Sequence, residues 1–439
     1  MKKVYILFLG SLLVTMSCST DLDEIPPNIA TSGSLTEFTE VLNAAYFYQL
    51  GSVTPMAVMG DFRADNALMF ESPYTEFDQY DPGLTAMDNQ FFRPFYSALY
   101  KSILSSNNII ENSGDVTQIG EAKFLRALSY FKLVQVFGDV TVNLSAEPST
   151  TDLSILARKP AAEVYNNVII PDLQDVIATL NNSGLSTGRA TKIAAQALLA
   201  KVYVHMGNFS SAEPQLAAVV NGAAAAGISL EANYSEIFDI ANVENSEIIF
   251  ATQISSSIID EYGFTDFWSW FLGNDTKAPK PLDTDLIAAF DASPGDLRRA
   301  VNIDEVALNS PKYPQAGGPD HDWIEMRLAD VILLYAETLN ENGSPATTVL
   351  PLLDGIRERA GLNDLDPNTI NTQALVRQAI QDERRLELAF EGHRWFDLVR
   401  TGTVDAEMGE TVNPNYYLFP IPISEILASD GVITQNPGY

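Results

Sequence analysis

The sequence is poor in cysteine, histidine and positive charge, and each shortage excludes a class of protein. Cys18 is the single cysteine among 439 residues, so no disulfide can form within the chain. The three histidines, His205, His321 and His393, lie far apart and cannot by themselves build a Cys/His zinc site. The 26 Lys and Arg residues stand against 57 Asp and Glu residues, a formal net charge of −31. Such a surface repels nucleic acid and anionic lipid headgroups, so we expect neutral or cationic partners.

Catalytic signatures are also missing. The sequence has no Gly-x-Ser-x-Gly elbow, no Walker-type phosphate loop and no His-Glu-x-x-His helix. A glycosidase needs two facing carboxylates, and no pair can be singled out among so many acidic residues. Some loop carboxylates could coordinate calcium, but such residues are common in an acidic protein; they are Asp283, Asp285, Asp304 and Glu305. We therefore predict a binding protein with no cofactor and no metal, rather than an enzyme.

The N-terminus has the features of an export leader. Two lysines near the start precede an apolar run over residues 4–14, which is too short to span a bilayer. Cys18 follows a small residue, as at a lipoprotein cleavage site, although the preceding box is imperfect. We predict a lipoprotein signal peptide over 1–17, acylation of Cys18 and a lipidated tether over 18–34. The alternative is an ordinary signal peptide with an incidental cysteine. No later stretch is apolar and long enough for a transmembrane helix.

Helical periodicity dominates the first half of the remaining chain. Apolar residues recur at spacings of three and four, as on the buried face of an amphipathic helix. A Gly-Asp pair at 138–139 marks one helix end, and Pro160 is suited to a first helical turn. We expect helices over residues 35–50, 91–111, 121–137 and 160–180.

Two segments match the tetratricopeptide pattern of a helix, a tight turn at glycine and a second helix. The first covers residues 199–212 with the turn at Gly207. The second begins at residue 334, turns near Gly343 and continues into a helix over 347–360. Small residues allow two helices to approach closely, and aromatic residues fill the spaces between them. These pairs favour a solenoid-like helical scaffold over a compact bundle.

Two stretches have a loop-like composition. Residues 229–322 are rich in Gly, Pro, Asn, Asp and aromatic residues, with one possible short strand at 247–251. Asp322 before Trp323 is interpreted as the N-cap of a following helix. The second stretch is residues 60–89. Long loops on a rigid scaffold are common places for binding sites.

Five segments occur in a characteristic order along the chain. They are a helix ending in Gly-Asp (123–139), a Leu…Asp-x-Arg segment (281–298), Arg-Leu-Ala-Asp-Val-Ile-Leu-Leu-Tyr-Ala-Glu (327–337), Glu-Arg-Arg-Leu-Glu-Leu-Ala-Phe-Glu-Gly-His-Arg-Trp-Phe-Asp within 383–402, and the ending Phe-Pro-Ile-Pro…Gln-Asn-Pro-Gly-Tyr (419–439). In this order they resemble the SusD/RagB outer-membrane lipoproteins of Gram-negative bacteria, over nearly all of the mature chain.

The resemblance implies a mainly α fold, in which a tetratricopeptide-like helical-repeat scaffold carries a loop-rich, irregular second half. It implies a single SusD-like domain over 35–439, with the scaffold at about 35–228 and 323–400 and the ligand loops at about 229–322. It also implies a surface lipoprotein, held on the outer membrane by its lipid anchor. Such a protein binds oligosaccharide, or in some members peptide, and delivers it to a SusC-like TonB-dependent transporter. A surface hydrolase and a tetratricopeptide adaptor for proteins remain as alternatives.

Three glutamates of one segment share a helix face. Glu383, Glu387 and Glu391 are spaced by four residues, which brings their side chains to the same side. They could form a metal or acid/base cluster. The favoured interpretation is a set of ion pairs that fix the helix to its neighbours, because the same segment holds as many guanidinium groups. The expected partners are Arg384, Arg385, Arg394 and Arg400.

The predicted ligand site rests on two tryptophans of the irregular region. Trp268 and Trp270 point to one side if their segment is extended, and a flat indole can cover the apolar face of a sugar ring. The same run and the 60–89 loop offer polar and aromatic residues that we expect to contact the ligand; they are Tyr262, Asp266, Asn274, Arg63, Asp65, Tyr74 and Tyr80. The alternative, left open by the sequence, is that this aromatic run is a small core that pins the loop.

Overall fold

The computed structural model describes residues 37–274, 276–314 and 320–439. The regular structure in these ranges is mostly helical, which confirms the predicted fold class. The predicted signal peptide, Cys18 and the tether lie outside the described residues and stay predictions. Within the described residues, none of the helices combines the length and the apolar character that a membrane crossing requires.

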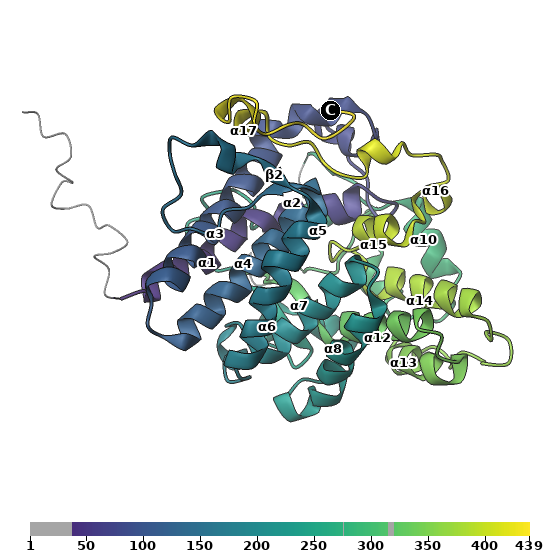
Figure 1. Cartoon of the computed structure of the whole chain (residues 1–439). Helices are drawn as coiled ribbons and strands as arrows, with labels where there is room; N and C mark the ends of the chain where they lie inside the picture. The colour runs from purple at the N-terminus through teal and green to yellow at the C-terminus, as the bar shows by residue number, and fades with distance from the viewer. Residues whose placement is uncertain (1–36, 275, 315–319) are drawn as a thin grey trace, which may run out of the picture. The chain divides into compact units, whose positions relative to one another are not determined.

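The N-terminal half is a succession of packed helices (Figure 1). Its two longest helices, α3 and α4, pack against each other, and α1 packs against both. The Asp115 side chain caps α4 by accepting bonds from two backbone N–H groups, and Gly138 ends it with a φ of +71°. The helices are α1 (Thr39–Phe47), α2 (Val53–Ala57), α3 (Arg93–Asn112), α4 (Val116–Phe137), α5 (Ala161–Val164), α6 (Ile170–Thr179), α7 (Lys192–His205) and α8 (Phe209–Gly222).

Both segments with the tetratricopeptide pattern form pairs of packed helices. Helices α7 and α8 are joined at Gly207, where φ is +68°. Helices α12 (Leu328–Glu341) and α13 (Ala346–Arg359) are joined at Gly343, where φ is +85°. Each turn needs a left-handed residue, and glycine adopts this conformation without steric cost. Helix α12 also packs against α8, so the two pairs are neighbours in space.

A buried apolar cluster ties the second pair to the C-terminal part. Leu333 of α12, Leu353 of α13 and Ile380 of α14 (Gln373–Glu387) all belong to it. These residues recur at helical spacing, so each helix turns one apolar face to the cluster. The C-terminal part continues with α15 (Arg394–Thr401), α16 (Val404–Glu407) and α17 (Ile423–Ala428).

The strands form two small antiparallel sheets. Strand β1 (Val140–Thr141) pairs with β2 (Arg158–Lys159). Strand β3 (Ile248–Thr252) confirms the expected strand and pairs with β4 (Trp323–Arg327), with Thr252 opposite Trp323. The helix expected to begin at Trp323 is therefore wrong at its start. Trp323 is in a strand, and the Asp322 carboxylate accepts a bond from the backbone N–H of Ile254 (2.7 Å) across the sheet instead of capping a helix.

The predicted irregular region contains more local structure than its composition indicated. Its described residues contain two 3-10 helices, Tyr234–Phe238 and Ile240–Asn242, and three short α-helices, α9 (Phe267–Phe271), α10 (Thr284–Asp291) and α11 (Arg299–Asn302). Asp283 caps α10 with its side chain. The 60–89 loop is built from short 3-10 and π turns rather than extended chain.

Candidate ligand-binding site

The two predicted ligand loops lie directly against each other. The backbone N–H of Leu68 donates to the carbonyl of Pro281, and that of Phe70 donates to the carbonyl of Lys277, both at 2.8 Å. The Thr276 hydroxyl adds a bond to the Glu71 carboxylate (2.6 Å). Segments about 200 residues apart in sequence therefore form one continuous surface. The two loops adjoin at these bonds rather than facing each other across a cleft, and their joint role in ligand binding stays a prediction.

The geometry expected for the two tryptophans is wrong. Residues 267–271 form helix α9, not an extended strand. Trp268 is 8% exposed and Trp270 is 5% exposed. The Trp270 ring meets Phe62 edge-on, with 6.2 Å between ring centroids. Burial of two large rings in a short helix supports the alternative that the aromatic run is a core that pins the loop.

Arg63 and Asp65, which were expected to meet ligand, are also buried. The Arg63 guanidinium donates to the carbonyls of Phe77 (2.5 Å) and Tyr416 (2.9 Å). The Asp65 carboxylate pairs with Arg394 (2.7 Å) and Arg385 (2.9 Å). Although burial opposes ionisation, Arg394 holds the pKa of Asp65 below its usual value. The charged ends of both side chains are bound to the protein, so they anchor the loop rather than present it to a ligand.

Two tyrosines of the predicted set have anchoring contacts as well. The Tyr80 hydroxyl donates to the carbonyl of Arg63 (2.8 Å), and its ring stacks on Trp395 with 5.5 Å between centroids. The Tyr262 hydroxyl accepts a bond from the Lys101 ammonium (3.3 Å) of helix α3. Tyr262 therefore contacts the N-terminal helices.

The accessible part of the loops is a small aromatic and polar surface, which we call the loop face: Phe70, Glu71, Tyr74, Asn274 and Lys277. Phe70 is 51% exposed and is the one aromatic residue classed as exposed in the described part of the chain. The Tyr74 ring is half-buried and meets Trp270 at 5.6 Å between centroids. The Lys277 ammonium lies 5.4 Å from the centre of the Tyr74 ring. The Phe70 ring can cover an apolar sugar face, and polar groups of the two bonded segments can hydrogen bond the hydroxyls of that sugar.

Sequence reasoning missed Phe70. It directly precedes Glu-Ser-Pro, a turn-forming stretch, and an aromatic residue next to such a turn is more easily left at the surface. The two tryptophans gave the stronger compositional signal, but their burial depends on packing partners such as Phe62 that lie elsewhere in the chain. Asp266, which immediately precedes α9, accepts a bond from the Ser269 hydroxyl (3.3 Å).

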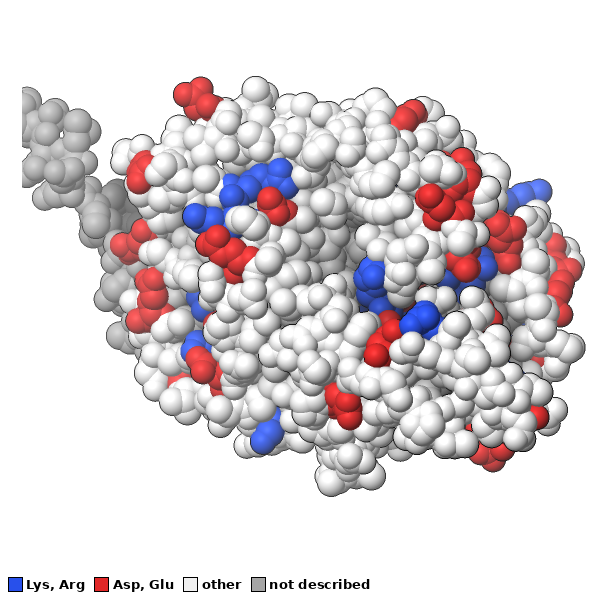
Figure 2. Space-filling view, turned by 45° about the vertical axis from the view of Figure 1, so that its right-hand side comes forward, with Lys and Arg blue, Asp and Glu red and all other residues white. Residues whose placement is uncertain are grey.

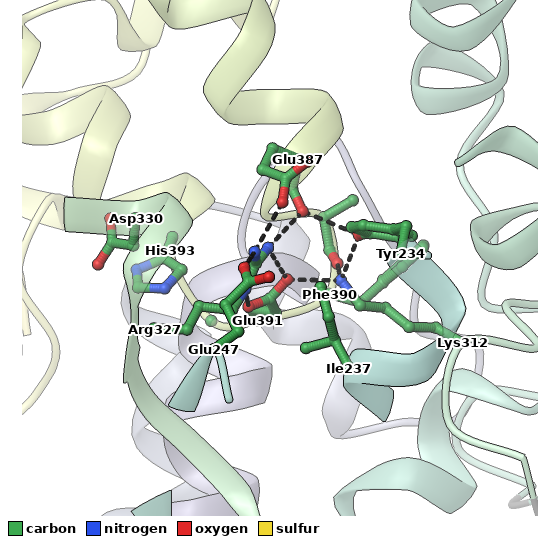
Figure 3. Close-up of polar contacts among 12 residues, drawn as sticks. Tyr234, Ile237, Glu247, Lys312, Arg327, Asp330, Glu387, Phe390, Glu391 and His393 are labelled. Atoms are coloured by element: carbon green, nitrogen blue, oxygen red, sulfur yellow. Dashed lines mark hydrogen bonds and ion pairs between the residues drawn. The ribbon is translucent and has the colours of Figure 1, made fainter. Parts of the chain in front are cut away.

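A buried ionic network lies behind these loops, and Figure 3 shows its centre. The Glu387 carboxylate forms ion pairs with Arg327 (2.6 Å), Arg298 (2.9 Å) and Arg359. The Glu391 carboxylate forms ion pairs with Lys312 and Arg327, both at 2.7 Å. The prediction that the spaced glutamates form ion pairs is thus confirmed.

The predicted partners within the same segment are wrong. The network matches five acidic groups with five basic groups, almost all from other elements: Glu247, Asp296, Glu383, Glu387 and Glu391 with Arg298, Lys312, Arg327, Arg357 and Arg359. The arginines of the segment pair elsewhere, for example Arg384 with Asp330 (2.9 Å) and Arg400 with Glu337 (2.5 Å). The single helix face expected for the three glutamates is also wrong, because α14 ends at Glu387, α15 begins at Arg394 and Glu391 lies in the turn between them. The charges that face the glutamates come mainly from strands, loops and helices that fold against this segment.

The network explains how the loops are held. Lys312 belongs to the irregular region, Arg327 to β4 and Glu387 to α14, so their bonds join three separate parts of the chain. Burial of Glu387 opposes its ionisation, but the surrounding arginines keep the pKa of its carboxyl well below the usual value. Burial lowers the pKa of Lys312 to about 8. Every group has a charged partner at hydrogen-bonding distance, which compensates the loss of hydration.

Charged groups elsewhere in the described part of the chain are dispersed. In the described ranges, no cluster of three or more His, Cys, Asp or Glu residues is arranged to hold a metal ion. On the face drawn in Figure 2, acidic and basic side chains are scattered over a largely uncharged surface, without a broad basic patch.

Comparison with known families gives matches to both halves of the chain. A family model described as "Starch-binding associating with outer membrane" matches residues 22–204, and the SusD family model matches residues 306–415. SusD-like protein P2 of Formosa agariphila is 28% identical, with 100% of both chains covered. Starch-binding protein SusD of Bacteroides thetaiotaomicron is 26% identical, with 77% of this chain and 76% of that protein covered.

Solved structures give the same result. A laminarin-binding SusD-like protein superposes with a TM-score of 0.73 at 25% identity, covering 92% of this chain and 99% of the other. A SusD superfamily protein from Parabacteroides distasonis has a TM-score of 0.77 at 23% identity, which shows the shared fold. With family models matching both halves, relatives aligned over the whole chain and a common fold, the chain belongs to the SusD family.

Proposed function

We propose that this protein binds extracellular oligosaccharide at the cell surface and delivers it to a partner TonB-dependent outer-membrane transporter, without catalysis. The observation that carries the proposal is the similarity over 92% of the chain to a laminarin-binding structure. The described part of the structure supplies a rigid helical scaffold with an aromatic loop surface, which is a suitable arrangement for sugar binding.

We place the glycan contact on the loop face. Phe70 offers the exposed ring, while Tyr74, Glu71 and Asn274 add groups that can hydrogen bond hydroxyls. The Trp270 ring, in contact with Tyr74, supports this surface. The proposed domain organisation remains a single SusD-like domain over 35–439.

Replacing Phe70 by Ala should weaken glycan binding by about 1–3 kcal/mol, because the stacking ring and its apolar contact area are lost. Fold stability should change little, since the side chain is half exposed. Isothermal titration of the purified mature protein against laminarin and starch oligosaccharides, with melting curves beside it, measures both quantities. Val116→Ala, an exposed apolar change at the start of α4, is the matched control and should bind normally.

The same titration and melting curves distinguish residues that contact the glycan from residues that hold the loop in place. Trp270→Ala should lower the melting temperature strongly, because truncation of a buried large ring costs about 3–5 kcal/mol. Normal binding by Phe70→Ala would place the ligand elsewhere. Release of shorter sugars during the titration would instead favour the surface-hydrolase alternative, and binding of peptides but no glycan would favour the peptide-binding one.

The proposed anchor and transporter partner are tested together in cells. A fatty-acid analogue should label the wild-type protein and not Cys18→Ala, because the thiol of Cys18 is the predicted acylation site. Gentle detergent extraction of the labelled protein should recover a large β-barrel protein with it, since tethering raises the local concentration of the pair. Equal labelling of both proteins would remove the anchor from the proposal, and repeated recovery of the chain alone would remove the partner.

A further inference from the structure

A cavity of about 670 Å³ lies between helices α4, α5 and α15 and the C-terminal segment 434–437 (Figure 1). Ligand sites in proteins usually have volumes of about 300–1,000 Å³, so this cavity can hold a small molecule or a short oligomer. It shares no residue with the loop face. Because its walls come from parts of the chain that are far apart in sequence, a ligand here would meet groups that only the fold brings together.

The wall of this cavity is fixed by internal hydrogen bonds. The Asn436 amide donates to the carbonyls of Phe137 (3.0 Å) and Phe419 (2.7 Å). The Arg158 guanidinium donates to the carbonyl of Thr434 (2.8 Å) and to Oδ1 of Asn436 (2.6 Å). These bonds hold the C-terminal segment against the end of α4 and against β2. The cavity is therefore preformed, and a ligand does not need to order its wall on binding.

The other charged groups of the lining are bound to the protein as well. The Arg400 guanidinium pairs with Glu337 (2.5 Å) and Asp397 (2.8 Å). The Asp139 carboxylate accepts a bond from the backbone N–H of Ala161 (2.9 Å), and solvent screens this exposed group. Both arginines of the lining are thus occupied, which leaves an anionic ligand without a counter-charge. The lining favours a neutral ligand.

Neutral polar groups of the lining remain for such a ligand. Burial raises the pKa of Tyr165, and within the described residues its hydroxyl has no hydrogen-bond partner. The amide nitrogen of Gln135 lies 3.2 Å from Nε2 of His205. Burial lowers the pKa of His205 well below its usual value, so the imidazole is neutral and Nε2 accepts the amide N–H. The amide oxygen of Gln135 is left without a donor from the described part of the chain. A buried polar group without a partner costs free energy, which a ligand hydroxyl can recover.

We propose that this cavity is a second carbohydrate site, which binds a neutral oligosaccharide through the Tyr165 hydroxyl, the Gln135 amide oxygen and the ring of Tyr417. A sugar hydroxyl both donates and accepts, so it matches a phenol and an amide oxygen. The half-buried Tyr417 ring lines the same cavity and can cover the apolar C–H face of a sugar ring. The inference rests on the proposed function, since it takes glycans as the ligands, and it adds a site that is separate from the loop face.

The test is isothermal titration with two neutral probes, laminaritetraose and maltotetraose. The mature wild type should bind two molecules per chain of the glucan that it recognises, and Phe70→Ala should leave one of these binding events intact. In the Phe70→Ala background, Tyr165→Phe should weaken that event roughly three- to tenfold, because one hydrogen bond is lost while the ring stays. Tyr417→Ala should weaken it about tenfold through lost apolar contact. Tyr335→Phe, at a half-buried tyrosine of α12 outside the cavity, is the matched control and should bind as its parent does.

Tyr165→Phe keeps the ring next to Phe131, so its melting curve should match that of the wild type and separate binding from folding. A single glucan per chain whose binding Phe70→Ala abolishes, with Tyr165→Phe and Tyr417→Ala binding normally, would overturn the second site and leave the proposed function standing. Binding of the anionic tetragalacturonate in the Phe70→Ala background as tightly as the neutral glucan would also overturn it. No binding of either glucan by the wild type would count against the proposed function itself and remove this site with it.

Discussion

Glu387→Gln should lower the free energy of unfolding by about 3–5 kcal/mol, the usual effect of removing one partner from a buried ion pair. Glu387 is fully buried and receives three guanidinium groups, from Arg298, Arg327 and Arg359. A neutral amide leaves these cations without their central anion while changing side-chain volume very little. Chemical denaturation monitored by circular dichroism measures the difference.

Two further variants make this experiment decisive. Glu358→Gln removes an exposed carboxylate of α13 and should change stability by less than about 0.5 kcal/mol. The double variant Glu387→Gln/Arg327→Met should be less destabilised than the sum of its single changes, because both belong to one network. If Glu387→Gln unfolds like Glu358→Gln, the buried network does not hold the loops to the scaffold.

Gly60→Ala should destabilise the protein by about 3 kcal/mol or more, because the added methyl has no space. A Cβ atom at Gly60 would lie 2.2 Å from the backbone carbonyl of Gly392. Gly392 cannot easily move away, because its own φ is +75° and Trp323 and the carbonyl of Met56 surround it. Gly60 opens the loop that carries Phe70, so the loop face should lose its order along with its stability. Thermal melting and glycan titration report these two effects.

A second glycine gives the opposite expectation. Gly355 lies within helix α13, and a Cβ atom there would meet nothing within 4 Å. Gly355→Ala should therefore stabilise the protein by about 0.5–1 kcal/mol through helix propensity alone. A neutral result for Gly60→Ala would contradict the close backbone approach of Gly60 and Gly392, whereas destabilisation by Gly355→Ala would contradict the open surroundings of Gly355.

The helices of this protein could be predicted from local sequence because their signals are local. The apolar spacing of the α3 and α4 segments, and the glycines at 207 and 343, act within a few residues of where they occur. The helix predicted to begin at Trp323 was wrong because the structure there depends on a distant segment. Asp322 before Trp323 has the form of a helix cap, but pairing with β3, about 70 residues earlier, makes the segment a strand.

The candidate site also combines features that local sequence indicates with features that depend on distant contacts. Sequence composition led to the two loops, and the structure joins them. Which side chains they expose could not be read from composition, because Trp270 is covered by Phe62 and Tyr74 from a distant segment while Phe70 is left at the surface. Arg63 and Asp65 have the chemistry of ligand contacts, yet both are buried and bound to internal partners.

The sequence by itself determined the helical class of this protein, its helix pairs, its acidic surface and its family resemblance, since each depends on periodicity, composition or the order of motifs. Only the tertiary structure decided which charges meet and which rings are buried. Glu387 and Glu391 carried a visible spacing, but Arg327 and Lys312 reach them from other elements. The cavity beside α15 likewise exists only because α4, α5, α15 and the C-terminal segment come together. Burial, ion pairing and cavities depend on contacts between distant residues, which local patterns do not specify.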